Sequence, residues 1–167
     1  MTSQDNSVIY DFQSPQPDAL SWHVVNDGVM GGLSKSKIVL TDKGNGLFTG
    51  AISTENNGGF ATAKRSFLQK EVSQFDRINL RVKGDGKSYQ LRIKSYEAQQ
   101  YSYVQKFKTS GEWQMITLYF DQFYPIYRGT SLDRPNYDGK LMAEITFLIG
   151  NKRDESFALE IERMWLA

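Results

Sequence analysis

Two glycine-rich segments near the N-terminus carry polar side chains that could bind a ligand. The first spans residues 22–32 and the second spans residues 55–60. A turn needs only one Gly or Asn with a positive φ, yet each segment has several such residues beside a large aromatic side chain. We therefore expect two ordered loops whose backbones come close to another part of the protein or to a ligand.

The polar residues of these loops have two interpretations. In the structural one, Asn26-Asp27-Gly28 forms a turn, Asn57-Gly58 closes a type I′ hairpin, and the paired glycines let two strands pass closely. In the functional one, amide and carboxylate groups of both loops line the rim of a binding site. The residues of that candidate site are Asn26, Asp27, Glu55 and Asn57. The pattern favours the structural interpretation.

Catalytic chemistry is poorly supported. His23 is the only histidine and stands between Trp22 and Val24, which favours a packed loop residue over a general base. The sequence has no cysteine, no Gly-x-Ser-x-Gly elbow, no histidine pair for zinc and no calcium-binding loop. Asp27 and Glu55 are the only carboxylates of the loops that suggest a glycosidase-like pair. We predict a protein without catalytic residues, metal ion or cofactor.

Composition limits the other classes of partner. The 20 basic and 19 acidic side chains of the 167 residues leave a net charge of +1, so no broad field draws in nucleic acid or an anionic membrane. No apolar run is long enough to cross a membrane, and the polar residues after Met1 do not predict a signal peptide. The sequence predicts a single domain, residues 1–167, that is cytoplasmic and not inserted in a membrane.

The elements that position these residues are strands. Apolar and polar residues alternate through residues 46–53, 60–66, 77–83, 89–94, 101–108, 113–120, 143–150 and 157–163. Helical periodicity is weak. The expected fold is all-β, an antiparallel β-sandwich such as a jelly roll.

One polar face of these strands is a second candidate site. If the strands on either side of residues 84–86 pair as a hairpin, five polar residues share a face: Asn79, Arg81, Gln90, Arg92 and Lys94. Tyr103 and Gln105 would extend that face, and Arg128 in the following loop could reach it. This face is either a solvated outer surface or a surface whose aromatic and amide groups bind a sugar.

The irregular segment 121–139 is a third candidate. It is rich in aromatic and basic side chains, namely Phe123, Tyr124, Tyr127, Arg128, Arg134 and Tyr137. Tyr and Arg are enriched at protein interfaces, but these rings could equally cap the open end of the sandwich.

A set of motifs spread along the chain resembles the complex I intermediate-associated protein 30 family. The motifs are Val25-Asn26-Asp27-Gly28-Val29-Met30-Gly31-Gly32, Phe48-x-Gly50, Glu55-Asn56-Asn57-Gly58-Gly59-Phe60, Gly84-Asp85-Gly86, Tyr103-x-Gln105-x-Phe107, Glu112-Trp113-Gln114, Arg128-Gly129 and Phe157-x-Leu159-x-Ile161. The resemblance implies a galactose-binding-like β-sandwich. It also implies kinship with mitochondrial assembly factors of respiratory complex I, which act as chaperones, while small members such as this chain look bacterial.

Two hypotheses for the function follow. The first is a non-catalytic binding or assembly-chaperone module that holds a protein partner, with a subunit of a membrane respiratory complex as the candidate. The alternative is a carbohydrate-binding module that holds a sugar on its polar face. Nucleotide or RNA binding on Arg81, Arg92 and Lys94 is the weakest alternative. The residues predicted to bind the ligand or partner are Asn26, Asp27, Glu55, Asn57, Arg92, Tyr103, Gln105 and Arg128.

Overall fold

The computed structural model describes residues 7–14, 22–26, 34–55 and 59–167. These residues form two antiparallel sheets with almost no helix, apart from short elements such as the 3-10 turn η4 (Phe120–Gln122). The all-β sandwich predicted from the alternating sequence is confirmed.

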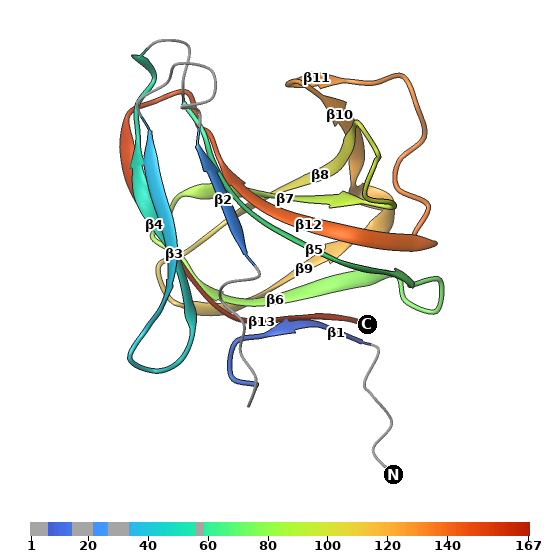
Figure 1. Cartoon of the computed structure of the whole chain (residues 1–167), viewed down its shortest axis with the longest axis horizontal. Coiled ribbons are helices and arrows are strands. Elements are labelled where there is room, and N and C mark those ends of the chain that lie inside the picture. The colour runs from blue at the N-terminus through green and yellow to red at the C-terminus, as the bar shows by residue number, and fades with distance from the viewer. Residues whose placement is uncertain (1–6, 15–21, 27–33, 56–58) are drawn as a thin grey trace.

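The first sheet has six strands. Their order is β3 (Lys35–Leu40), β4 (Gly46–Ile52), β13 (Glu155–Leu166), β6 (Arg77–Lys83) and β9 (Trp113–Tyr119), and β1 (Val8–Asp11) pairs with one end of β13. The second sheet has seven strands. Their order is β11 (Thr130–Ser131), β10 (Tyr124–Tyr127), β8 (Ser102–Lys108), β7 (Ser88–Lys94), β12 (Leu141–Ile149), β5 (Ala61–Glu71) and β2 (His23–Asn26). Figure 1 shows β6, β13 and β1 on one side of β5 and β12.

The inward faces of both sheets meet in one apolar core. Ile78, Leu80 and Val82 point inward from β6, and Leu91 and Ile93 point inward from β7; none of the five is exposed to solvent. Alternation along each strand places polar residues on the outward face of the same strand.

The strands β6 and β7 do not form the hairpin that was predicted. β6 pairs with β13 and β9, whereas β7 pairs with β8 and β12. Residues 84–86 therefore carry the chain from one sheet to the other. Asn79 and Arg81 lie on the outward face of the six-stranded sheet, and Arg92 lies on that of the seven-stranded sheet. The prediction of one continuous polar face is wrong, because alternation within a strand does not specify which strands are its neighbours.

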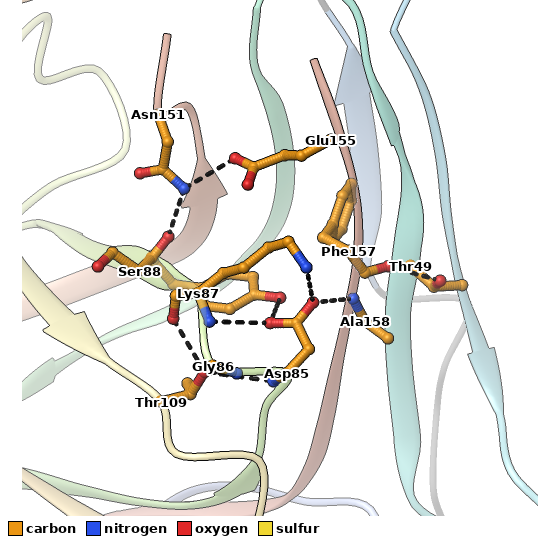
Figure 2. Close-up of polar contacts among 11 residues, drawn as sticks. Thr49, Asp85, Gly86, Lys87, Ser88, Thr109, Asn151, Glu155, Phe157 and Ala158 are labelled. Carbon is orange, nitrogen blue, oxygen red and sulfur yellow. Dashed lines mark hydrogen bonds and ion pairs between the residues drawn. The ribbon is translucent and has the colours of Figure 1, made fainter. Parts of the chain in front are cut away.

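The carboxylate of Asp85 fixes this crossing (Figure 2). Its Oδ1 accepts hydrogen bonds from the backbone N–H of Lys87 at 3.3 Å and from the hydroxyl of Tyr89 in β7 at 2.9 Å. Its Oδ2 accepts from the backbone N–H of Ala158 in β13 at 2.8 Å. One side chain therefore joins the central part of one sheet to that of the other.

The hydroxyl of Thr109 holds the backbone of the same turn. Its oxygen accepts from the backbone N–H groups of Asp85 at 3.3 Å and Gly86 at 3.1 Å, and it donates to the carbonyl of Lys87 at 2.9 Å. A Cβ at Gly84 would overlap the side chain of Thr109. Glycine at this position therefore allows the close contact between Thr109 and the turn.

We predict that Asp85→Ala destabilises the protein strongly. The substitution leaves the N–H of the half-buried Ala158 and the hydroxyl of the buried Tyr89 without their acceptor, and two unsatisfied donors of this kind cost about 2 kcal/mol or more together. Urea denaturation followed by circular dichroism measures the change. Asp76→Ala is the matched control, because its carboxylate is 65% exposed in a surface ion pair with Arg77 and should change the free energy of unfolding far less. Equal losses in both variants would contradict the role given to Asp85.

A second prediction concerns alkaline pH. Burial raises the pKa of Tyr89, and the neighbouring Asp85 raises it further. The folded state therefore favours the protonated phenol, and its contribution to stability is complete below the unfolded pKa of about 10 and is lost as the pH rises above it. We expect Tyr89→Phe to lower stability at neutral pH and to flatten the decline above that value, as measured by urea denaturation across this range. Tyr96→Phe, at an exposed ring, should keep the wild-type profile.

Candidate functional site

Strand β12 is buried on both of its faces. Residues 142–149 are all buried; Ile145, Phe147 and Ile149 belong to the core between the sheets. The residues that alternate with them point to the other side, where Glu144 and Thr146 are only 6% and 9% exposed. On a solvated outer face such residues would be exposed to water. Side chains of the neighbouring strands must therefore cover the outward face of β12.

A buried carboxylate lies at the centre of this coverage. Glu144 on β12 is directly opposite Ser66 of β5 and Lys94 of β7. Its Oε2 lies 3.8 Å from Nζ of Lys94, its Oε1 lies 3.9 Å from Nζ of Lys64, and the hydroxyl of Ser66 donates to Oε1 at 3.3 Å. Two lysines therefore compensate the charge of one carboxylate, and the cluster carries a net positive charge.

Next to this cluster lies Arg92, which is opposite Thr146 on one side and Val104 on the other. Its Nε and Nη2 both donate to Oε1 of Gln90, at 3.2 and 2.9 Å. Burial lowers the pKa of the guanidinium, and the nearby Tyr124 offsets part of that effect. Arginine nevertheless stays charged in proteins, so Arg92 holds a cation in a place of restricted solvent access.

We call this surface the charged face. Its members come from β5, β7 and β12: Lys64, Gln90, Arg92, Lys94, Glu144 and Thr146. It presents fixed hydrogen-bond donors around one carboxylate. Tyr124, a half-buried residue of β10, lies at its edge. The arrangement can bind groups that carry carbonyl, hydroxyl or carboxylate oxygens.

Of the residues predicted from the sequence, Arg92 lies in the charged face, but Tyr103 and Gln105 do not. They are opposite Ile93 and Leu91, so they point to the inward side of the sheet. The Gln105 amide donates to the carbonyl of Tyr119 at 3.1 Å, a contact between the two sheets. The expected extension of the polar face through these residues is therefore wrong, since their register places them on the opposite side.

The ring of Tyr103 also packs inward. It lies 5.2 Å from the ring of Tyr137 and 5.5 Å from that of Tyr101, and burial raises its pKa. Phe123 and Tyr137 are buried as well. These two rings of segment 121–139 therefore belong to the core and are not exposed to a partner, and their capping of the end of the sandwich stays a prediction.

The loop residues of the first candidate site lie mostly beyond what the structure describes. Asp27 and Asn57 fall outside the described residues, and the backbone of Asn26 ends β2 opposite Ala61. Glu55 is exposed, and its backbone N–H donates to the hydroxyl of Ser53 at 3.2 Å. The meeting of the two loops stays a prediction.

Arg128 lies away from the strands, in the turn between β10 and β11, where its φ is 49°. Its guanidinium lies 5.3 Å above the ring of the exposed Tyr127. A positive φ at a non-glycine residue is uncommon, which marks this turn as a constrained one.

Lys64 and Glu144 were not predicted from the sequence as residues of this site. Glu144 interrupts an otherwise apolar strand, and a charge in a run that is buried on both sides is the feature that could have revealed it. Lys64 gives no such indication, because exposed strands carry many lysines.

Chemistry of other kinds finds little support in the described part of the chain. No group of three or more His, Cys, Asp or Glu residues there could hold a metal ion. His23 is exposed on β2, opposite Lys64. None of the helical segments among the described residues is long and apolar enough to cross a membrane.

Comparison with known proteins gives one matching family. The model of the complex I intermediate-associated protein 30 family matches residues 10–161. The mitochondrial protein of that name from Drosophila melanogaster is 24% identical over 188 residues, which cover 97% of this chain and 63% of the relative. The corresponding Mus musculus protein is 26% identical over 181 residues, or 93% of this chain and 54% of the relative. The chain therefore spans somewhat more than half the length of these relatives.

Solved structures share the fold. A family 11 carbohydrate-binding module from a cellulosomal cellulase of Clostridium thermocellum superposes with a TM-score of 0.66 at 18% identity, covering 96% of this chain and 93% of that one. The Clostridium thermocellum module in complex with a β-1,3-1,4-mixed-linked tetrasaccharide gives 0.65 at 18% identity, covering 96% and 94%. At this identity the likeness concerns the fold alone.

Proposed function

Because this chain belongs to the complex I intermediate-associated protein 30 family, we propose that it is a non-catalytic binding module that holds a protein partner, as an assembly chaperone does. The relatives are named for their association with a complex I intermediate. We extend to this chain the role of holding a subunit of a membrane respiratory complex. The cytoplasmic location and the single-domain organisation of the chain stay predictions.

The observation that carries the proposal is the buried charge on the outward side of β12. Glu144 is 6% exposed and is held by Lys64 and Lys94. Burying charged groups costs desolvation energy that ion pairing often does not recover. Apolar or neutral residues often stabilise a buried position as well as an ion pair does, so the presence of this cluster supports a role in binding in addition to its role in fixing the strand register.

The chemistry of the charged face suits a polypeptide better than a sugar. The face offers fixed cationic donors in Lys64, Arg92 and Lys94, which match the carbonyl and carboxylate oxygens of a protein segment. Their ordering within the folded sheet reduces the entropy lost on binding. A sugar ring is usually held against flat aromatic surfaces, and among the described residues of this face only Tyr124 at its edge offers one.

We predict that the charged face determines capture of the partner. A tagged chain incubated with detergent-solubilised membranes of the source cell should retain a specific protein, and Arg92→Ala combined with Lys94→Ala should reduce the retained amount about tenfold or more. The matched control is Lys152→Ala with Arg153→Ala, which removes the same charge from exposed positions between β12 and β13. Mass spectrometry of the captured material is the measurement. Capture of nothing above background, or equal loss in both variants, would refute the proposal.

The alternative function is carbohydrate binding, which the fold likeness to family 11 modules supports. We expect titration calorimetry with the β-1,3-1,4-mixed-linked tetrasaccharide, taken to millimolar concentration, to give no binding heat. Binding that is lost in the Arg92→Ala variant and kept in the Arg153→Ala variant would instead establish the charged face as a sugar site.

A further inference from the structure

Three arginines lie over aromatic rings on the opposite side of the molecule. On the outward face of the six-stranded sheet, Arg77 lies 4.9 Å from the ring of Tyr119, Arg81 lies 5.4 Å from that of Trp113, and Arg163 lies 4.5 Å from that of Trp165. We call these six residues the arginine–aromatic face. They come from β6, β9 and β13, which are adjacent strands.

The register brings two of these arginines side by side. Arg81 of β6 is directly opposite Arg163 of β13. Like charges placed directly opposite each other in a sheet are destabilising. Each guanidinium lies over the electron-rich face of an indole ring, and this contact offsets part of the repulsion between the two arginines.

The charge of Arg77 on this face is already compensated. Its guanidinium lies 2.7 Å from the carboxylate of Asp76.

The two central arginines lack that compensation. Asp11 is the other neighbour of Arg163 in the sheet, but its Oδ1 accepts from the backbone N–H of Gln13. Within the described part of the chain, Arg81 and Arg163 form no ion pair or hydrogen bond through their guanidinium groups. The edges of both groups therefore keep donors for a ligand.

Exposed apolar side chains lie beside the arginines. Met115, directly opposite Arg81 on β9, is 56% exposed, and Tyr119 is 44% exposed. Trp, Tyr and Arg are the residues most enriched among those that dominate binding energy at protein interfaces. A partner that fits this surface combines anionic groups for the two guanidinium groups with apolar groups for Met115.

We propose that the arginine–aromatic face binds an acidic polypeptide segment, with carboxylate side chains on Arg81 and Arg163 and apolar side chains on Met115. Planar carboxylates accept two parallel hydrogen bonds from a guanidinium. A single-stranded nucleic acid fits less well, because arginines already lie over the Trp113 and Trp165 rings that bases would stack on. This face is separate from the charged face, so the proposal does not rest on the proposed function.

The test is a fluorescence titration that follows the tryptophan emission of the full chain. Trp113 and Trp165 lie on this face, and the buried Trp22 adds a background that the ligand should not change. The probe is a synthetic peptide of alternating Glu and Leu, compared with a Lys and Leu peptide and with oligouridylate RNA at low salt. The Glu peptide should change the emission with a saturable curve, and the other two should not. Absence of saturable binding by the Glu peptide, or tighter binding of the RNA, would overturn the proposal.

Variants separate a specific site from general charge attraction. Arg81→Gln with Arg163→Gln should weaken binding of the Glu peptide about tenfold or more, because charge-assisted hydrogen bonds are lost. Lys152→Gln with Arg153→Gln makes the same change of net charge elsewhere and should leave the affinity within about twofold. Equal weakening in both double variants would refute the site. If the first variant unfolds, Arg81→Lys with Arg163→Lys keeps both charges, and unchanged affinity there would likewise refute bidentate recognition.

Discussion

The arrangement of the two sheets depends on the hydrogen bonds that the carboxylate of Asp85 accepts. This carboxylate accepts from the Tyr89 hydroxyl in one sheet and from the Ala158 N–H in the other, at the place where the chain leaves β6 and enters β7. A half-buried acceptor shared in this way couples the positions of the two sheets, because moving either would leave a donor such as the buried Tyr89 hydroxyl unsatisfied. The same contact sets which residues of β7 point outward. Gln90, Arg92 and Lys94 therefore owe their place on the charged face to a turn beyond one end of that face.

The charged face imposes a constraint of its own. Glu144 finds both lysines only while β12 stays in register with β5 and β7. A slip of one residue would turn its carboxylate into the core and an apolar residue outward. The buried ion pairs thus add little to the free energy of unfolding. They penalise the wrong register, and they leave the face with a fixed pattern of charges.

Much of the fold could be predicted from alternation, and the reasons for the failures are physical. The outward and inward residues of β6 and β7 follow directly from their period of two. Their separation into different sheets depends on contacts between residues far apart in the sequence. One of these is the hydrogen bond between Asp85 and Ala158, which are 73 residues apart, and no local pattern reveals it. Tyr103 and Gln105 were assigned to the wrong side for the same reason, because their face depends on pairing with Ile93 and Leu91. Of the candidate site, Arg92 was found, and Glu144 was not, since its partners come from two other strands.

The two outward faces solve the same electrostatic problem differently. On the charged face, a carboxylate neutralises neighbouring lysines, so that surface presents both signs of charge at close range. On the arginine–aromatic face, indole rings stabilise the cations without neutralising them. A ring leaves the net charge of the guanidinium intact and its edge donors available, whereas a carboxylate occupies them. The first surface therefore favours a ligand that is itself mixed in charge, and the second favours one that is anionic. A single sandwich can thus contact two chemically different segments at once, one on each sheet, without competition between them.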